Sequence, residues 1–363
     1  MIYTSGSTGT PKGVATRHRN LVNYATFIVN KLRSSGTATS EGLQFATVST
    51  IGADLGNTCV FPALVSGGCL HVIPYDVAMD GKLFGSYVSQ HPIDVLKITP
   101  SHLNSLLASQ GGNALLPRKV LFLGGEASSW DLIQRIATGG SCKVINHYGP
   151  TETTVGSLTF DVGDANFEST RSLTVPIGRP IANTQVYLLD SRLAPVPIGV
   201  PGELFIGGAG VASGYLNQPE QTAERFVRNP FSTDPNARLY RTGDLARYLP
   251  DGNIEFLGRK DAQVKIRGFR IELGEVENAF RSLKGVRDVV AHVHADSDST
   301  KTLVAYVVSE PDTHPNPSEL LKAAREILPS PSVPSLIAFL PRLPLGPTGK
   351  VDRRALPPPE RCA

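Results

Sequence analysis

The chain has 363 residues, of which 40% are hydrophobic, and a formal net charge of +3 from 35 basic and 32 acidic residues. Its length suffices for two or three domains with buried cores, and its composition excludes a disordered chain. The near balance of charge gives no electrostatic reason to expect a nucleic acid as partner. No apolar run reaches the roughly 18 residues that a membrane helix needs, so we expect no membrane partner either.

The cysteines are scattered along the chain and form no CxxC pair; they are Cys59, Cys69, Cys142 and Cys362. This spacing indicates neither a disulfide framework nor a zinc site. We therefore expect reduced thiols in a cytoplasmic protein.

A run rich in Gly, Ser and Thr, "IYTSGSTGTPKG", begins at Ile2. Its glycines allow backbone amides to approach an anion, its hydroxyls add donors, and Lys12 adds a positive charge. The spacing is not that of the GxxxxGK loop of ATPases, because Lys12 follows Gly9 by three residues and precedes a glycine. Taken alone, a phosphate-binding loop and a plain flexible turn are about equally good interpretations of this run.

Strands and helices are predicted to alternate after this loop. Apolar residues at helical spacing predict a helix over 18–32, and later helical stretches lie at 100–109 and 129–138. Short apolar strands are expected within 94–100 ("DVLKITP"), 119–125 ("KVLFLGG") and 143–149 ("KVINHYG"). The alternation predicts an α/β fold with a mostly parallel sheet. Ligands of such sheets bind beyond the carboxyl ends of strands, so "FLGGEAS" and "NHYGPTETT" are candidate site loops.

The pattern of predicted elements changes near residue 183. From there, short strands separated by turns predict a smaller β-rich unit over about 183–258. Beyond it, two amphipathic helices around two strands predict a small α+β domain. The polar stretch "GRKDAQ" is a candidate hinge between a domain at 1–260 and a domain at 261–357. Residues 358–363 have the composition expected at the start of a linker.

Three further stretches carry candidate ligand-binding side chains. In "NHYGPTETT", Tyr148 offers a ring face to a base, Thr151 a donor to phosphate, and Glu152 a carboxylate for Mg²⁺. A surface turn with a Thr/Glu helix cap is an equally good interpretation. In "YRTGDL", Asp244 follows a glycine at a strand end, where a carboxylate can accept from both ribose hydroxyls, but a plain turn uses the same residues. In "GPTGKVDRRAL", Lys350 by itself would be an ordinary surface lysine.

In this order the stretches resemble successive core motifs of the adenylation domains of nonribosomal peptide synthetases. The matching segments are "YTSGSTGTPKG", "NHYGPTE", "GELFIGGAGVASGYL", "YRTGDLARYLPDGNIEFLGRKDAQVKIRGFRIELGEVE" and "GPTGKVDRRAL". The resemblance extends to about residue 357. It implies the adenylate-forming enzyme fold, with a large N-terminal α/β domain and a small, mobile C-terminal α+β domain. In that family the first loop lies well inside the N-terminal domain, so we expect this chain to be a fragment without the preceding strands.

The resemblance implies a ligase that works in two half-reactions. A carboxylate attacks the α-phosphate of ATP, giving an acyl-adenylate and pyrophosphate, and the phosphopantetheine thiol of a carrier protein then takes the acyl group. The implied cofactors are ATP, Mg²⁺ and phosphopantetheine on a separate carrier domain. The implied partners are an amino-acid substrate, a peptidyl carrier protein domain and neighbouring synthetase modules.

The family's functional residues can be placed on the matching positions. Lys350 is the implied catalytic residue, Glu152 the implied metal ligand and Asp261 the implied hinge, while Gly268 marks the loop implied to enter for thiolation. The residues implied to bind the nucleotide are Thr4, Ser5, Gly6, Ser7, Thr8, Gly9, Lys12, Gly125, Glu126, Ala127, Asn146, Tyr148, Gly149, Thr151, Asp244 and Arg259.

The stretch "ADLGNTCVFPAL" resembles the family's substrate-binding motif. Asp54 stands where an Asp usually pairs with the α-ammonium of an amino acid; a helix-capping role is the alternative. The other implied pocket residues are Leu55, Thr58, Lys97, Phe122, Gly124, His147, Val155 and Gly156.

Lys97 lies inside an apolar strand, and a lysine is rarely buried without a partner. With His147 near it, the pocket is expected to offer two cationic or donor groups to a side-chain carboxylate. The combination also resembles the family's aspartate-type pocket, from which Phe122 departs. Aspartate is therefore our first choice of substrate, followed by asparagine or glutamate. The alternative is that Lys97 extends to the surface.

Two segments depart from the family pattern without removing a catalytic group: Pro331 and Ser332 stand where Tyr-Met is usual, and Thr348 where Asn is usual. Two other functions remain open. One is an acyl- or aryl-CoA ligase of the same superfamily, against which Asp54 argues. The other is a catalytically silent fragment that only docks to a carrier or to a neighbouring module.

Overall fold

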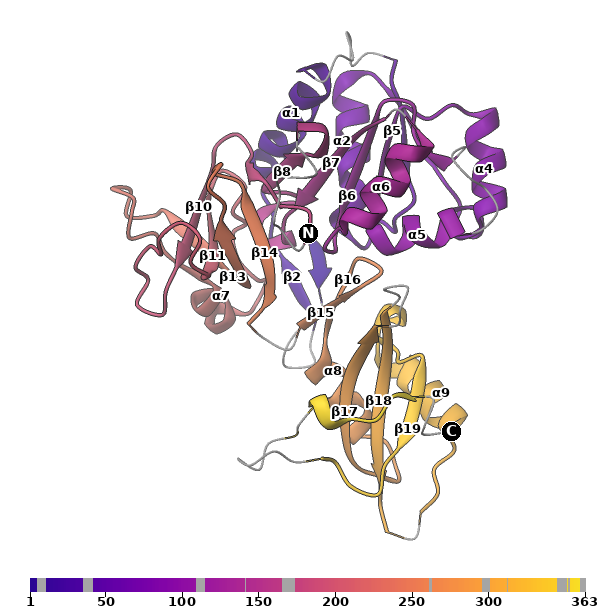
Figure 1. The fold of residues 1–363 in the computed structure, drawn as a ribbon. Coiled ribbons are helices and arrows are strands. Elements are labelled where there is room, and N and C mark those ends of the chain that lie inside the picture. The colour runs from indigo at the N-terminus through magenta and orange to yellow at the C-terminus, as the bar shows by residue number, and fades with distance from the viewer. Residues whose placement is uncertain are drawn as a thin grey trace. The chain divides into compact units, whose positions relative to one another are not determined.

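The computed structural model describes residues 1–4, 11–34, 42–108, 115–140, 142–164, 174–260, 263–295, 301–311, 313–344, 351 and 353–359. The chain divides into two compact units (Figure 1). The first consists of Met1–Thr4 and Gly13–Asp261, and the second of Ser5–Lys12 and Ala262–Ala363. None of the described helices combines the length and the apolar character that crossing a bilayer requires.

A seven-stranded sheet organises the first unit. Five neighbouring strands pair in parallel and the last two pair antiparallel. From edge to edge the strands are β4 (Cys69–Val72), β3 (Gln44–Thr47), β5 (Val95–Ile98), β6 (Val120–Gly124), β7 (Lys143–Tyr148), β8 (Leu158–Asp161) and β9 (Arg179–Pro180). The predicted α/β fold with a mostly parallel sheet is confirmed.

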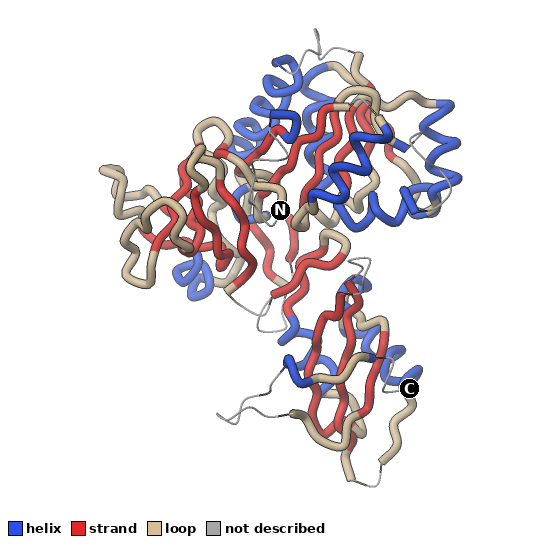
Figure 2. The backbone as a smooth tube through the Cα atoms, in the orientation of Figure 1, coloured by secondary structure: helices blue, strands red, loops and turns tan. Residues whose placement is uncertain are grey.

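Helices cover both faces of this sheet (Figures 1 and 2). Their bounds are α1 (His18–Ser34), α2 (Asn57–Ser66), α3 (Tyr75–Met79), α4 (Gly81–Gln90), α5 (Pro100–Ala108) and α6 (Trp130–Gly139), with short 3₁₀ turns η1 (Asp54–Gly56), η3 (Thr151–Thr153) and η4 (Val162–Asp164). Because both faces are covered at the centre of the sheet, β6 is buried throughout and reads as a continuous apolar run.

The two cores on the faces of the sheet follow from the alternation of side chains along each strand. On β6, Phe122 points to the face where it packs with Tyr24 of α1 and Cys59 of α2. Its neighbours Leu121 and Leu123 point to the other face, into a core formed with α4, α5 and α6. Each residue of the inner strands is therefore assigned to one face by its position alone.

A five-stranded antiparallel sheet completes the first unit. Its strands are β10 (Thr184–Leu189), β11 (Gly202–Gly208), β12 (Phe226–Arg228), β13 (Arg238–Tyr248) and β14 (Ile254–Arg259), with the helix α7 (Pro219–Arg225). Near the start of the chain, β1 (Ile2–Thr4) and β2 (Lys12–Val14) form a two-stranded sheet.

The second unit contains a hairpin and a small three-stranded sheet with two helices. Its elements are β15 (Gln263–Ile266), β16 (Phe269–Glu272), α8 (Leu273–Arg281), β17 (Val286–Ala295), β18 (Lys301–Ser309), α9 (Pro317–Ile327), β19 (Leu336–Phe339) and the turns η5 (Ser330–Ser332) and η6 (Arg353–Ala355). Val276 and Phe280 of α8 pack with Leu320 and Ala324 of α9 in one apolar core with the sheet. This is the small α+β arrangement that the sequence predicted.

Candidate active site

Four predicted pocket residues share one face at the carboxyl ends of β5, β6 and β7. The register pairs Lys97 with Phe122, and Gly124 with His147. Since side chains two apart on a strand point the same way, all four face the side covered by α1 and α2. The structure thus brings together residues that the resemblance assigned to one substrate pocket.

A chain of hydrogen bonds links these residues to the helices above them. The Lys97 Nζ lies 2.9 Å from Nδ1 of His147. The other ring nitrogen of His147, Nε2, lies 3.0 Å from the Tyr24 hydroxyl, which is 2.8 Å from Oγ1 of Thr58. Lys97 is 0% exposed. The alternative in which Lys97 extends to the surface is therefore wrong.

The expectation that His147 supplies a second cationic or donor group is wrong in its cationic form. Burial, and then the nearby Lys97, hold the pKa of His147 well below its ordinary value of 6.5. The imidazole is therefore neutral at neutral pH, and both of its nitrogens face protein groups. The cause is desolvation, which sequence alone cannot report.

Three glycines leave the space that the polar cluster and the turn after β7 need. A β-carbon at Gly124 would collide with the ammonium of Lys97 and the carbonyl oxygen of His147. A β-carbon at Gly156 would collide with the imidazole of His147, and one at Gly149 with the backbone of Gly156. Side chains at these positions are thus excluded by the polar cluster and by the turn after β7.

The turn after β7 carries backbone strain. Thr154 and Val155 have φ angles of 65° and 66°, a left-handed conformation that β-branched residues rarely adopt. The Thr154 hydroxyl donates to the carbonyl of Gly210 at 2.8 Å, which helps to hold this conformation. Such strain persists where the surrounding structure imposes it, and it clusters at functional sites.

Glu152 lies inside this turn with a fully buried carboxylate. The Tyr215 hydroxyl donates to its Oε1 at 2.7 Å. Within the described ranges, no group of three or more His, Cys, Asp or Glu side chains could hold a metal ion. One carboxylate fits Mg²⁺ only if phosphate oxygens and water supply the other ligands, which is how Mg²⁺ is usually bound at nucleotide sites.

The residues expected at the ribose also come together. Asp244 of β13 and Arg259 of β14 form an ion pair with 2.6 Å between Oδ1 and Nη1. The Tyr148 hydroxyl donates to the other carboxylate oxygen, Oδ2. Burial, and then the charge of Asp244, raise the pKa of Tyr148, so the phenol keeps its proton. The Tyr148 ring lies next to Phe256, with 6.5 Å between ring centroids.

Asn146 is engaged by the protein on the opposite face of β7. Its Oδ1 accepts from the Ser128 hydroxyl at 3.0 Å, and its Nδ2 donates to the carbonyls of Val175 and Pro176 at 3.2 and 2.8 Å. In this structure the amide therefore joins three segments of the first unit. Nucleotide binding by Asn146 stays a prediction.

The other predicted nucleotide-binding residues lie in loops or at strand ends. Gly125, at φ 85°, and Glu126 follow β6, and Oε2 of Glu126 accepts from the backbone amide of Ser101 at 3.2 Å. Thr151 begins η3, and Thr4 ends β1. Ala127 follows Glu126 directly, as the predicted adenine-lining segment requires.

Asp54 and Leu55 form the turn η1, directly before the helix that carries Thr58. The residue that caps η1 is Ala53, and the cap of α2 is Gly56. Asp54 is thus the first residue of η1 and not the residue assigned as the cap of η1 or of α2.

Lys12, in the second unit, lies 3.8 Å from the Glu272 carboxylate and is buried. Gly268 occupies the tight turn between β15 and β16 with φ 80°, next to Arg267 at φ 50°. Two such residues in sequence are typical of the turn that matches the twist of a hairpin. The predicted residues Ser5, Gly6, Ser7, Thr8, Gly9, Asp261 and Lys350 lie outside the described residues.

Residues 1–216 match the family described as AMP-binding enzyme, and residues 275–350 match the AMP-binding enzyme C-terminal domain. The chain belongs to the AMP-binding enzyme family. The predicted resemblance to adenylate-forming enzymes and the predicted ligase class are thereby confirmed.

Relatives of this AMP-binding enzyme include bacitracin synthase 3 of Bacillus licheniformis, which is 43% identical over 100% of the chain. The chain spans only 6% of that protein's length. Among solved structures, an NRPS protein containing adenylation and PCP domains matches 98% of the chain and 59% of its own, with a TM-score of 0.82 and 29% identity. A four-domain nonribosomal peptide synthetase bound to AMP and glycine matches 99% of this chain over 26% of its own length, with a TM-score of 0.64 and 37% identity.

Sequence reasoning missed three polar residues of the site in this AMP-binding enzyme. Tyr24 lies within the helix predicted over 18–32, and Tyr215 and Thr242 lie inside recognised motifs, but none of the three has a predicted role. Thr242 receives a hydrogen bond from Arg259 on its carbonyl at 3.1 Å. No local signal identifies Tyr24 or Tyr215, because their partners His147 and Glu152 are distant in sequence.

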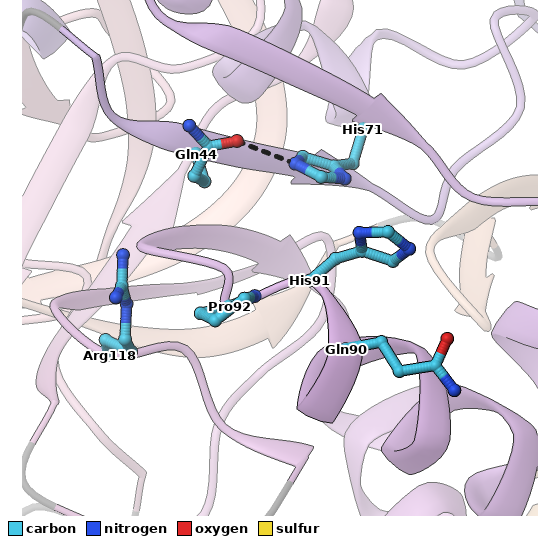
Figure 3. Close-up of a pocket in the computed structure, with 6 residues that line it drawn as sticks. All are labelled: Gln44, His71, Gln90, His91, Pro92 and Arg118. Atoms are coloured by element: carbon cyan, nitrogen blue, oxygen red, sulfur yellow. Dashed lines mark hydrogen bonds between the residues drawn. The ribbon is translucent and has the colours of Figure 1, made fainter.

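A separate hollow of about 260 Å³ lies at the other end of the same sheet (Figure 3). His71 is engaged there through both ring nitrogens, by the Tyr87 hydroxyl at 3.0 Å and by Gln44 Oε1 at 2.8 Å. Arg118 is paired with Asp94 at 2.8 Å. Since ligands of open α/β sheets bind at the carboxyl ends of strands, this hollow is not the candidate site. Its lining residues are Gln44, His71, Gln90, His91, Pro92 and Arg118.

Proposed function

We propose that this chain is an adenylation domain of a nonribosomal peptide synthetase. It activates an amino acid with ATP as an aminoacyl-adenylate, releases pyrophosphate, and transfers the aminoacyl group to the phosphopantetheine thiol of a carrier domain. The main support for the proposal is that two neighbouring residues of β7 belong to two different groups of polar residues. His147 belongs to the pocket cluster on one face, and the next residue, Tyr148, belongs to the Asp244–Arg259 group on the other.

One strand therefore separates a candidate amino-acid pocket from a candidate ribose site. This spacing suits a reaction in which the carboxylate of one ligand must reach the α-phosphate of the other. Positioning two reactants in this way lowers the entropic part of the barrier. The proposed nucleotide contacts are the ribose hydroxyls at Asp244 and Arg259 and the adenine at Tyr148 and the Gly125–Ala127 segment.

Further roles are proposed for groups around the phosphates. Glu152 would hold Mg²⁺, which supplies positive charge to the phosphates when bound. Lys350 would contact the charge that develops on the α-phosphate, and loss of such a group commonly lowers the rate about 10²–10³-fold. The loop from Thr4 to Lys12 would hold the β- and γ-phosphates.

Aspartate is the proposed substrate, with asparagine and glutamate next. Asp54 would pair with the α-ammonium group, and Lys97 would face the side-chain carboxylate. The support is the position of Lys97, which is 0% exposed and whose Nζ lies against Gly124 on the face covered by α1 and α2. Because His147 is neutral, Lys97 alone would provide the positive charge from this pair of residues.

Thiolation is proposed to follow a rotation at Asp261 between domains at 1–260 and 261–357, which brings the Gly268 loop toward the site. The proposed partners are a peptidyl carrier protein domain and neighbouring synthetase modules in the cytoplasm. Such domain rotations usually take microseconds to milliseconds.

The experiment that tests the proposal is amino-acid-dependent exchange of pyrophosphate into ATP, measured on this chain with each of the twenty amino acids. We expect the largest signal with aspartate. A signal with plain acyl or aryl acids would favour a CoA ligase instead. No exchange with any acid, from a folded chain, would contradict the proposal and favour a silent docking fragment.

A further inference from the structure

Tyr24 occupies the centre of the polar cluster although it comes from a helix far away in sequence. It lies on α1 and is 1% exposed. Its hydroxyl bridges Thr58 of α2 at 2.8 Å and Nε2 of His147 on β7 at 3.0 Å. The Tyr24 and His147 rings also meet edge to face, with 5.8 Å between their centroids. One hydroxyl thus connects α1 and α2 to β7 of the sheet.

The chemistry of the groups fixes the direction of these hydrogen bonds. A lysine ammonium has three donors and no acceptor, so Nδ1 of His147 must accept from Lys97. A neutral imidazole has one N–H, which then lies on Nε2 and donates to the oxygen of Tyr24. The Tyr24 hydroxyl is left to donate to Thr58. Burial is the main cause that raises the pKa of Tyr24 and lowers the pKa of His147, so both groups are neutral, as this direction requires.

We propose that Tyr24 is a positioning residue that accepts from the Nε2–H of His147, fixes the orientation of the imidazole and thereby holds the Lys97 ammonium in place in the proposed substrate pocket. This inference rests on the proposed function, because it assigns Tyr24 to the selection of an amino acid with a carboxylate side chain. Tyr24 acts through His147 and Lys97.

The consequence of losing the hydroxyl follows from donor and acceptor counts. Without Tyr24 as acceptor, the buried Nε2–H of His147 loses its partner at 3.0 Å. The proton stays on Nε2, because on Nδ1 it would face the ammonium of Lys97, a second donor. The unpaired Nε2–H then turns toward another acceptor, and because Nδ1 belongs to the same ring, this rotation also displaces the hydrogen bond to Lys97. The pocket would keep its shape and lose the position of its charge.

The test is Tyr24→Phe in the full chain, since phenylalanine preserves the ring contacts. We expect the KM for aspartate in pyrophosphate exchange to rise about tenfold while kcat changes less than about twofold. Tyr87→Phe is the matched control, because the Tyr87 hydroxyl also binds a histidine, Nδ1 of His71, at 3.0 Å. This control should leave the KM for aspartate unchanged.

The tautomer is measured directly by NMR on the chain with ¹⁵N-labelled histidine. The His147 signal, assigned by its absence in His147→Gln, should report Nε2–H in the wild type, and the Nε2 chemical shift should change in Tyr24→Phe because this N–H has lost its acceptor. An Nδ1–H tautomer in the wild type would overturn the inference even if the variant failed to fold. An unchanged KM for aspartate in Tyr24→Phe would also overturn the inference. An equal loss of kcat for all amino acids would overturn it too, because such a loss marks a general structural defect.

Failure of the proposed function is distinguishable from failure of the inference. If the wild type exchanges pyrophosphate with no amino acid, the proposed function fails, while the NMR result still decides whether Tyr24 accepts from His147. If exchange occurs and the Nε2 signal of His147 does not respond to Tyr24→Phe, the function stands and the inference is wrong.

Discussion

Asp244 and Arg259 lie opposite each other in the register of β13 and β14, with 2.6 Å between Oδ1 and Nη1. Both side chains are largely buried, at 5% and 12% exposure. The Tyr148 hydroxyl donates to the second carboxylate oxygen, and the Asp244 backbone amide donates to Oγ1 of Thr242 at 2.9 Å. The carboxylate is thus held by donors from two different sheets of the first unit, in the position that the proposed ribose contact requires.

Asp244→Asn should destabilise the chain by about 3–5 kcal/mol, because it leaves the buried guanidinium of Arg259 without its carboxylate. The free energy of unfolding is measured by urea denaturation. The control is Glu224→Gln, which removes an exposed ion pair with Arg225 at 3.8 Å and should change stability by about 0–1 kcal/mol. Equal effects of the two substitutions would contradict the assignment of a buried pair.

Gly124→Ala should lower both stability and activity. The new β-carbon would collide with the Lys97 ammonium and with the carbonyl of His147, and the backbone carbonyl cannot move freely within the sheet. Such overpacking costs about 1–3 kcal/mol. The control is Gly163→Ala, where nothing lies within 4 Å of the added carbon. Thermal unfolding compares the two variants, and a loss as large in the control would show that the collision is not the cause.

Lys97→Met should abolish any preference for aspartate while preserving the volume of the side chain. The variant removes the positive charge from the proposed pocket, and it leaves Nδ1 of His147 without a donor, which costs about 1–3 kcal/mol. We expect the KM for aspartate to rise about 10²-fold in pyrophosphate exchange across the twenty amino acids. Lys119→Met, at an exposed position, is the control. An unchanged substrate profile would exclude Lys97 from substrate selection.

The stability of the chain should fall as the pH is lowered from 7.5 to 5.5. The pKa of His147 is lower in the folded chain than its ordinary value of 6.5, so below that value the unfolded chain binds a proton that the folded chain does not. One such group contributes at most about 1.4 kcal/mol per pH unit. The pKa values of His71, His292 and His294 are lowered too and add in the same direction.

The share of His147 in this pH dependence is isolated by His147→Gln, which cannot take up a proton in this range. Urea denaturation at pH 7.5 and 5.5 gives the slope for the variant and for the wild type. The free energy of unfolding should change less with pH in the variant than in the wild type. The raised pKa of Glu275 acts in the opposite direction, but it is present in both proteins. A slope that does not change would mean that His147 is protonated in the folded chain.

The sequence by itself determined the family, the fold class and the order of the elements. The apolar runs around Lys97, Phe122 and Ile145 are long enough and bounded clearly enough to predict β5, β6 and β7. The alternation with helical stretches predicts a parallel sheet, and the carboxyl ends of the strands then predict the place of the site. These are local features, because periodicity and turn residues act over a few neighbouring positions.

Only the tertiary structure decided the state and the partners of the site residues. Tyr24 reaches His147 across 123 positions of sequence, and Tyr148 reaches Asp244 across 96. The neutral state of His147 depends on how completely the fold removes water from it and on the distance to Lys97. Both quantities arise from packing and strand register, so they exist only once α1, α2 and the sheet have come together.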